Sequence, residues 1–259
     1  MAEPTEPQQI LAADLELTIA GRTLAVRLPV PTGRTDLRGL LPALRALMAG
    51  LCGVALDIAA GEGRDVSCRA GCGACCRQLV PLAGAEAHEL AALVELLPPD
   101  RRATVRARFA AARSRLEAAG LWPVLTGMAG ITDPKAAAAL GLDYFAQRIP
   151  CPFLEDESCS IHPDRPLACR EYLVSSDPAR CADPGGERVV PIKLDRRLAA
   201  AVARTGTADG RPHYVAMTAL FEFVAGHPEA PPGQDAAAIL GEVLSHLTGS
   251  AVIADPPAL

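Results

Sequence analysis

Aromatic residues are scarce in this sequence, at 3% of 259 residues, although hydrophobic residues make up 50% of the chain. The core must therefore be built mainly from Ala, Leu and Val, and the many alanines favour helices. A basic excess is also missing, because the formal net charge is −5. The arginines between residues 101 and 115 follow a helical pattern that is typical of a solvent-facing helix surface. This charge balance gives no electrostatic footprint for nucleic acid, so we expect no nucleic-acid partner.

The sequence also lacks the patterns of a secretory signal and of a membrane span. Residues 1–9 are acidic and Pro-containing, without the basic and then apolar regions of a signal peptide. The most apolar stretch, residues 40–60, contains Pro42, Arg45 and Asp57, whereas a membrane span needs about 20 apolar residues with few or no charges. We therefore interpret this stretch as a buried helix and expect a cytoplasmic location with no membrane span.

Hydrophobic periodicity predicts a mainly α fold with a small N-terminal β-hairpin. Residues 14–30 alternate between apolar and polar side chains on either side of a turn at residues 20–22, which is typical of a hairpin. Asp36 could cap the first helix, and Asp133-Pro134 is typical of an N-cap followed by the first helical residue. The predicted helices cover residues 36–60, 84–97, 99–119, 134–147, 212–226 and 235–248.

Residues 149–194 are rich in Pro, Cys, Asp and Ser and show no sustained period. A long irregular segment inside a compact domain usually needs something to order it. The sequence has no internal repeat and no clear domain boundary, so we expect a single domain over residues 1–259. Within it we distinguish an N-terminal hairpin and helix at about 14–62, a cysteine region at about 64–182, and C-terminal helices at about 195–250.

Nine cysteines are the most informative residues that the chain does contain. Reducing conditions in the cytoplasm disfavour disulfides, so clustered cysteines there more often bind metal or perform redox chemistry. Soft thiolates select zinc, copper(I) or iron–sulfur clusters, and spacings of two and three residues let successive thiolates converge on one centre. Eight of the cysteines fall into two windows about 75 residues apart. The candidate metal ligands are Cys68, Cys72, Cys75, Cys76, Cys151, Cys159, Cys169 and Cys181.

Neighbouring residues bear on how these thiols could bind. Cys75 and Cys76 would point about 100° apart on a helix, or to opposite faces of a strand, so regular structure would not let both bind one ion. One of them then serves a second centre or crosses to the other window, and the sequence leaves this open. Gly71 and Gly73 would let the backbone approach a metal closely. Four arginines beside the cysteines could offset the negative charge of a thiolate centre: Arg69, Arg77, Arg165 and Arg170.

The ninth cysteine and the histidines are weaker candidates. Cys52 lies in an apolar helical run and is interpreted as a buried structural thiol. His162 follows Cys159 by three residues and could coordinate a metal. The other four histidines are interpreted as surface or capping residues: His88, His213, His227 and His246.

These residues resemble the YkgJ-type cysteine-cluster family, a zinc- or iron-chelating domain with the pattern C-x3-C-x2-C-C. The first window matches through Cys68, Cys72, Cys75 and Cys76. The second window matches through Cys151-Pro-Phe-Leu, Cys159-Ser-Ile, Arg165-Pro, Cys169-Arg and Cys181. His162 stands where the family usually has Tyr, which argues against an obligatory ligand role for it. The resemblance covers roughly residues 66–182 and implies a bound zinc or iron.

The cysteine set is more distantly similar to that of flagellin lysine N-methylases, for which an iron–sulfur cluster is expected. Those proteins are longer, so the resemblance does not transfer their activity to this chain. We predict a metal-binding protein that holds an iron–sulfur cluster (4Fe–4S) or zinc, with a structural or redox role. Closing both windows on the metal would staple the irregular segment to the helical core. Spacing alone does not separate zinc from iron.

Two other function classes stay open. One is an iron–sulfur-dependent protein-modification enzyme, either lysine N-methylase-like or of the radical S-adenosylmethionine type, whose cysteine spacing is that of Cys68, Cys72 and Cys75. Against the radical type, Ala74 replaces the usual aromatic residue, and residues 84–148 read as successive helices instead of a strand–helix barrel. The other is a thiol redox sensor or metal chaperone, which the vicinal pair Cys75-Cys76 would suit.

Overall fold

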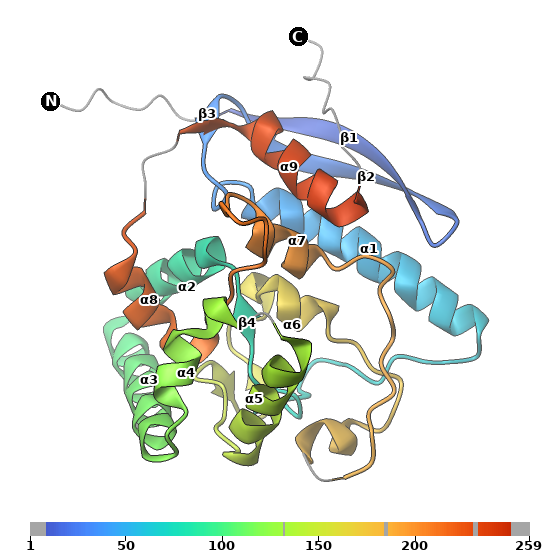
Figure 1. Cartoon of the computed structure of the whole chain (residues 1–259). Coiled ribbons are helices and arrows are strands. Elements are labelled where there is room, and N and C mark those ends of the chain that lie inside the picture. The colour runs from blue at the N-terminus through green and yellow to red at the C-terminus, as the bar shows by residue number, and fades with distance from the viewer. Residues whose placement is uncertain (1–8, 132, 184–185, 230–232, 250–259) are drawn as a thin grey trace, which may run out of the picture.

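The computed structural model describes residues 9–131, 133–183, 186–229 and 233–249 (Figure 1). Within these residues helices dominate and the strands form two-stranded antiparallel sheets, so the predicted mainly α fold with an N-terminal hairpin is confirmed. The α-helices are α1 (Leu41–Gly61), α2 (Gly84–Leu96), α3 (Pro99–Ala118), α4 (Trp122–Thr126), α5 (Pro134–Ala146), α6 (Leu167–Glu171), α7 (Leu198–Arg204), α8 (Leu220–Gly226) and α9 (Ala236–Thr248). The strands are β1 (Ile10–Ile19), β2 (Arg22–Pro31), β3 (Arg34–Thr35), β4 (Pro81–Leu82), β5 (Leu154–Glu155), β6 (Ser158–Cys159), β7 (Val215–Ala216) and β8 (Gln234–Asp235). Short 3-10 helices lie at Met128–Gly130, His162–Asp164, Pro178–Ala182 and Met217–Ala219.

Strands β1 and β2 form the predicted hairpin, which is longer than residues 14–30. Their pairing runs from Ile10 opposite Pro31 to Ile19 opposite Arg22. Ala20 and Gly21 form the two-residue turn and both have positive φ angles, of 50° and 75°. Two positive φ values in succession match the turn type whose twist suits a tight hairpin.

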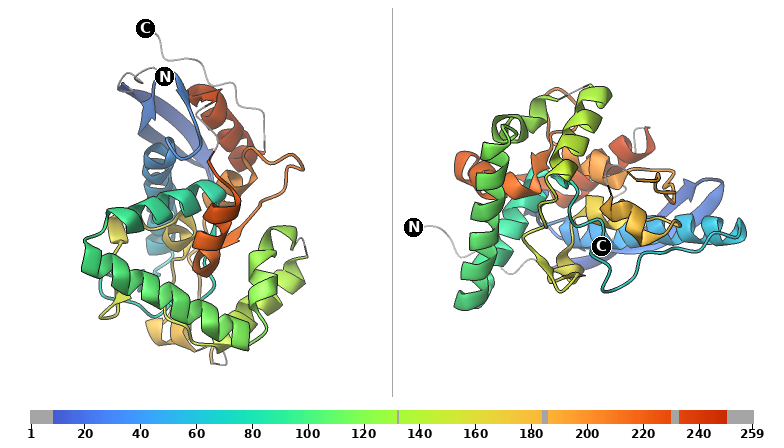
Figure 2. Two further views of the ribbon diagram at one scale, coloured as in Figure 1. Left: turned by 90° about the vertical axis from the view of Figure 1, so that its left-hand side faces the viewer. Right: turned by 90° about the horizontal axis from the view of Figure 1, so that it is seen from below.

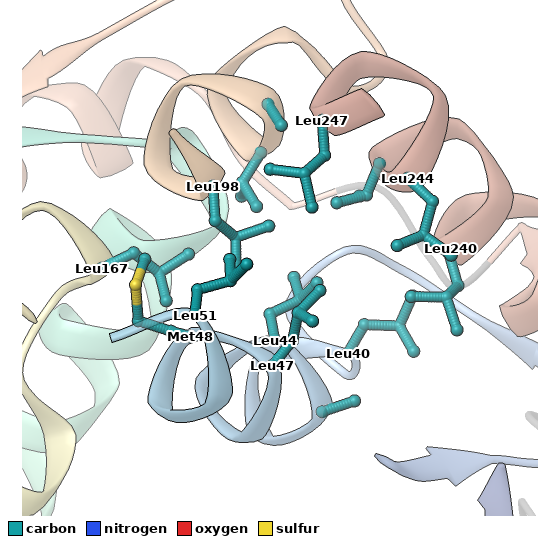
Figure 3. Packing of buried hydrophobic residues seen from close by; sticks show 14 of the residues in the cluster. Leu40, Leu44, Leu47, Met48, Leu51, Leu167, Leu198, Leu240, Leu244 and Leu247 are labelled. Carbon is teal, nitrogen blue, oxygen red and sulfur yellow. The ribbon is translucent and has the colours of Figure 1, made fainter. Parts of the chain in front are cut away.

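Helix α1 lies against the hairpin and forms the centre of the largest hydrophobic cluster (Figure 3). Its Leu44 and Leu47 are fully buried and face Leu240 and Leu244 of α9. Burying one such side chain stabilises the fold by about 1.5–3 kcal/mol. By length and composition alone α1 could cross a membrane, and it is the one helix among the described residues with this property. In the fold, its apolar side chains form the core, as the interpretation as a buried helix expects.

The predicted start of this helix at Asp36 is wrong. The Asp36 carboxylate accepts a hydrogen bond from the Gly39 backbone N–H, at 2.9 Å, and closes a turn that precedes the helix. Helix α1 begins five residues later, with Pro42 in its first turn, where the missing N–H of proline costs no hydrogen bond.

A second group of helices, α2, α3 and α8, packs around another hydrophobic cluster, in the part of the molecule below α1 and the hairpin in Figure 1. Figure 2 shows α3 along one side of this part, with the irregular segment beside it. Phe109 of α3 meets Phe153 of that segment edge to face, with ring centroids 5.6 Å apart. Such an aromatic pair adds about 0.5–1.5 kcal/mol beyond the buried area. Helix α3 therefore supports the chain between Cys151 and Cys159.

The predicted helix over residues 212–226 is partly wrong. Val215 and Ala216 pair instead with β4, and the Met217 N–H donates to the Val80 carbonyl at 3.0 Å, so the α-helix begins at Leu220. The predicted helix at 134–147 is confirmed, and Asp133 caps it by accepting from the backbone N–H groups of Lys135 and Ala136. The helix near 235–248 is confirmed in the same way, with Asp235 as its cap.

Most arginines of α3 pair with glutamates near the surface, as the predicted solvent-facing pattern expects, but Arg108 is half-buried and also donates to the carbonyls of Pro152 and Leu154. Arg101 pairs with Glu155, and Arg113 pairs with Glu117 and Glu222. Surface pairs of this kind contribute about 0–1 kcal/mol each. The link between Arg101 and Glu155 also ties α3 to the turn that follows Cys151.

Candidate metal centre

The first cysteine window is a run of tight turns between α1 and β4. The Cys72 N–H donates to the Arg69 carbonyl at 3.2 Å, and the Cys76 N–H donates to the Gly73 carbonyl at 2.9 Å. Gly71 has a φ of +78°, a conformation that favours glycine over other residues. Because this segment is neither helix nor strand, the directions of the Cys75 and Cys76 side chains are set by the turn.

The second window lies directly against the first. The Cys151 N–H donates to the Cys76 carbonyl at 2.7 Å, which joins the two windows through their backbones. Strands β5 and β6 follow, connected by Asp156 and Glu157, which both have positive φ angles. Gly73 packs against this turn, because a Cβ at Gly73 would lie 2.9 Å from the Glu157 carbonyl oxygen. The close backbone approach that the structure shows at Gly73 is toward the second window, and the predicted approach to a metal stays a prediction.

Thiols from both windows line one cavity of about 210 Å³. Apolar side chains complete its wall, including Val80, Phe153 and Ile161. The thiol of Cys151 contacts the thioether of Met217 in this cavity, with Cys151 Sγ 3.5 Å from Met217 Sδ. Six of the eight candidate ligands are in the lining: Cys72, Cys75, Cys76, Cys151, Cys159 and Cys169.

The other two candidate ligands, Cys68 and Cys181, lie outside this lining. Cys68 Sγ is 3.9 Å from the backbone carbonyl of Tyr172, and the Tyr172 side chain is hydrogen-bonded to the Cys181 thiol. Gln78 donates to both the Tyr172 hydroxyl and the Cys181 carbonyl, at 3.3 and 3.1 Å. Tyr172 and Gln78 therefore hold this second pair of cysteines together.

All nine cysteines are free thiols. Cys52 lies on α1, outside the cavity, with its Sγ 3.6 Å from the Arg170 carbonyl. Burial raises the pKa of the Cys52 thiol to about 11, so it stays protonated at neutral pH. This placement agrees with its interpretation as a structural thiol.

The cavity thiols differ in their protonation. The Cys76 side chain hydrogen-bonds to Cys75 and lowers the pKa of the Cys75 thiol to about 7, with help from the nearby Arg165 and Arg77 charges. Burial raises the pKa of the Cys151 thiol to about 12, and it raises that of Cys169 well above its usual value. Because metals bind thiolates, loading the cavity would release protons from these buried thiols.

The four predicted arginines take different positions. Arg165 and Arg69 line the cavity, and the buried Nε of Arg165 has no hydrogen-bond partner among the described residues. Arg77 binds Glu157 through two hydrogen bonds of 2.7 and 2.5 Å, and Arg170 donates to the Arg165 carbonyl at 2.8 Å. Arg165 is therefore the arginine whose free donor fits a negative group in the cavity.

Two further residues of the cavity were weak or absent in the sequence prediction. His162 lies in the lining, and the neighbouring Arg165 charge lowers the pKa of its imidazole. A neutral imidazole can bind metal, although the departure from the family pattern still argues against an obligatory role. Met217 gave no sequence signal, because it lies in a stretch predicted as plain helix.

The donor set and the cavity fit a soft, negatively charged group that is larger than one ion. Among the described residues, no group of three or more His, Cys, Asp and Glu side chains is arranged to hold a single metal ion. A single zinc ion needs four thiolates at about 2.3 Å. The cavity volume of 210 Å³ is several times the roughly 30 Å³ that one water occupies in the liquid. Six cysteines line the cavity as possible thiolate ligands, and the Arg165 Nε has no hydrogen-bond partner among the described residues and could donate to a negative group there.

Comparison with known proteins identifies the region that carries these residues. Residues 67–185 match the family model CxxCxxCC, described as "Putative zinc- or iron-chelating domain". No curated protein and no solved structure matches the chain. The similarity to flagellin lysine N-methylases therefore stays a prediction. The match includes every candidate ligand and supports metal binding. Residues 67–185 of the chain, somewhat under half of its length, are therefore similar to this cysteine-cluster family.

Proposed function

We propose that the protein is a redox protein that holds an iron–sulfur cluster in the cysteine cavity. The observation that carries this proposal is the meeting of six cysteines from two distant windows around one space of 210 Å³. A family description of zinc or iron chelation supports metal binding but does not choose between the metals. The volume of the cavity and the number of cysteines that line it favour a cluster over one zinc ion.

The surroundings of the cavity favour a redox role over a purely structural one. Cys72 and Gly71 line both the cavity and an open cleft of about 440 Å³. Structural metal sites are closed, whereas sites that react keep an open side. The cleft is lined by Arg69, Arg77 and Arg148 and by Glu157, which pairs with Arg77, so arginines outnumber carboxylates on this side. A redox partner could therefore approach the centre at Cys72.

The residues of the chain would hold and tune the bound group in distinct ways. A bound iron–sulfur cluster supplies one-electron chemistry. The cavity cysteines provide thiolate ligands, and the Arg165 guanidinium offsets their negative charge and has an Nε–H free to donate. Phe153, Ile161 and Val80 exclude water from the inner wall. The free thiols throughout the chain suit a reducing compartment, and we propose the cytoplasm as the location.

The test is reduction of the anaerobically purified protein with dithionite, followed by absorption and electron paramagnetic resonance spectroscopy. We expect visible absorption that bleaches on reduction and a new paramagnetic signal. Both should be lost in a variant carrying Cys151→Ser and Cys169→Ser, and both should persist in Cys52→Ser. A wild-type protein that is colourless and silent in both measurements would exclude the proposal.

Among the alternatives, the radical S-adenosylmethionine type loses support. All strand pairs among the described residues are antiparallel, whereas the barrel of such an enzyme needs parallel strands joined by helices. A thiol redox sensor keeps one specific observation, the hydrogen bond between the neighbouring side chains of Cys75 and Cys76. Formation of a Cys75–Cys76 disulfide by mild oxidant, detected by mass spectrometry and reversed by reductant, would favour the sensor.

A further inference from the structure

A second cavity lies apart from the cysteines and has no part in the proposed function. Its volume is about 750 Å³, against about 210 Å³ for the cysteine cavity, and among the described residues the two linings share none. Helices α2 and α8, which lie side by side in Figure 1, form one of its sides, and α7 and the turn before α1 form another. Sites for small organic ligands have volumes of about 300–1,000 Å³, so this cavity is large enough for one.

The cavity lies where three hydrophobic clusters meet. Val202 belongs to the cluster around α1, Val215 to the cluster around α2 and α3, and Leu125 to the cluster that contains α4. Ligand sites commonly lie between packed helices in this way. The apolar side chains of the lining favour a ligand with a substantial apolar surface.

Three aromatic rings form a row along the side made by α2 and α8. The Phe223 ring stacks on the His227 ring with centroids 4.4 Å apart, and it meets the His88 ring edge to face at 5.8 Å. Nδ1 of His227 lies 2.9 Å from the Phe223 carbonyl oxygen, to which it donates, and this bond fixes the orientation of the imidazole. All three residues line the cavity. Because aromatic rings prefer other flat rings as neighbours, this row suits a planar conjugated ligand.

The charged groups of the lining disfavour an anionic ligand. Three carboxylates and one arginine line the cavity among the described residues. Arg38 binds Glu229 at 2.8 Å. Glu222 binds Arg113 at 2.7 Å, and Asp36 closes the turn that precedes α1. A phosphate or carboxylate would therefore meet net repulsion, and the arginine is already paired.

Polar groups without partners are available instead. The His88 imidazole and the Tyr214 hydroxyl line the cavity, are half-buried, and have no hydrogen-bond or ion-pair partner among the described residues. Burial raises the pKa of the Tyr214 hydroxyl, which therefore stays a neutral donor. Covering these groups with hydrocarbon would cost them their hydrogen bonds to water. A ligand that fits must therefore carry donors and acceptors at its edge.

We propose that this cavity binds an uncharged fused heteroaromatic ring, of the kind present in flavins and nucleosides. The face of the ring would lie against Phe223, and its heteroatoms would supply the hydrogen-bond partners that His88 and Tyr214 lack. The absence of charge avoids repulsion by the carboxylates of the lining. Because the linings are separate, the site does not depend on whether the cysteine cavity holds a cluster or zinc.

Equilibrium dialysis of the anaerobically purified full-length protein tests this proposal. The probes are two neutral compounds, riboflavin and adenosine, and their phosphates, flavin mononucleotide and adenosine monophosphate. At least one neutral probe should bind at one molecule per chain, and its phosphate should bind at least about tenfold more weakly because of the carboxylates. Failure of both neutral probes to bind, or tighter binding of a phosphate, would overturn the proposal.

Two conservative variants test the position of the ligand. Tyr214→Phe should weaken binding by roughly two- to tenfold, the usual effect of losing one hydrogen bond. Tyr172→Phe, outside the lining of this cavity, should bind the probe as wild type does. An unchanged affinity in Tyr214→Phe, or an equal loss in both variants, would contradict the assignment.

Hydrogen exchange in the wild-type protein locates the probe without any substitution. Peptides from α2 and from residues 202–227 should exchange more slowly with the probe bound, whereas peptides from β1 and β2 should not change. Protection confined to the cysteine windows would place the probe in the other cavity and overturn the proposal.

Discussion

Gly73 joins the two cysteine windows at the scale of a single residue. A Cβ at this position would lie 2.7 Å from Leu154 Cδ1 and 2.9 Å from the Glu157 carbonyl oxygen, and the backbone oxygen cannot move without disturbing the β5–β6 turn. We expect Gly73→Ala to lower the free energy of unfolding by about 1–3 kcal/mol, as other overpacked sites do. Urea unfolding measures this change.

Gly53→Ala is the matched control for that substitution. Gly53 lies inside α1, and a Cβ there would meet no atom within 4 Å. Alanine should therefore stabilise the helix, by up to about 1 kcal/mol. Equal effects of the two substitutions would show that the contact of Gly73 with the turn is unimportant.

Arg165 should act on the retention of the metal. Its Nε is buried beside the cavity without a partner among the described residues, and its charge favours the thiolate form of Cys75. We expect Arg165→Gln to weaken metal retention by about tenfold, a typical effect of removing a group that supports the ligands. Iron remaining after incubation with a chelator measures this. Arg27→Gln, on the exposed hairpin and outside the cavity lining, should retain iron as wild type does. A wild-type rate of iron loss in Arg165→Gln would exclude the role.

Sequence reasoning at this scale found the cysteines because residue type and spacing carry their chemistry. It did not find Met217, whose sulfur contacts Cys151 from 66 positions away, because long-range contacts of an apolar residue leave no local pattern. It also could not rank the arginines: Arg165 and Arg170 are close in the chain, but one lines the cavity and the other binds a backbone carbonyl.

At the scale of elements, the short helix α6 holds Cys169 in place through two buried glutamates. Glu86 of α2 accepts hydrogen bonds from the backbone N–H groups of Ala83 and Leu167, at 3.0 and 2.7 Å. Glu171 at the end of α6 accepts from the Ala199 N–H at 2.8 Å and from Arg197. A five-residue helix has little stability by itself, so these bonds fix its position.

Glu86→Ala should therefore destabilise the protein and loosen the metal centre. The substitution leaves two buried N–H groups without acceptors, which costs about 2–4 kcal/mol in the free energy of unfolding. The free energy of unfolding measured with urea and the iron retained after incubation with a chelator should both decrease. Glu95→Ala removes an exposed ion pair of the same helix and should cost less than about 1 kcal/mol. If the two variants proved equally stable, Glu86 would not anchor α6.

Long periodic elements were predictable from the sequence, and short ones were not. The hairpin and the helices α2, α3, α5 and α9 follow clear patterns, and Pro, Asp or Gly lies at one or both ends of each. Helices α4, α6 and α7 have five to seven residues, too few for a periodic signal, and their packing partners decide their conformation. Packing partners also decide the start of the segment predicted as a helix at 212–226, where Val215 and Ala216 pair with β4 instead of forming a helix.

At the scale of the whole molecule, the metal centre and the main core lie in different parts of the chain. The largest hydrophobic cluster gathers α1, α7 and α9 and takes Leu167 from α6, whereas the cavity cysteines Cys151, Cys159 and Cys169 pack against the cluster around α2 and α3. Removing the metal should therefore loosen the segment at 149–182 and leave α1 protected.

Hydrogen exchange followed by mass spectrometry tests whether the metal holds residues 149–182 in place. We expect peptides from residues 149–182 and 66–78 to exchange faster after metal removal, while peptides from α1 remain unchanged, because opening is local where few buried contacts hold the chain. Equally faster hydrogen exchange in peptides from every part of the chain would show that the core also depends on the metal for its stability. Unchanged exchange at the cysteine windows would exclude stapling.

The central claim is that the six cavity cysteines enclose an iron–sulfur cluster, and iron and acid-labile sulfide analysis of protein purified without oxygen tests it most directly. The account predicts iron and sulfide in equal amounts, several of each per chain, in wild type and in Cys52→Ser, and neither in the variant with Cys151→Ser and Cys169→Ser. Wild-type protein that contains zinc but no sulfide, or a cluster that survives loss of both buried cysteines, would contradict it.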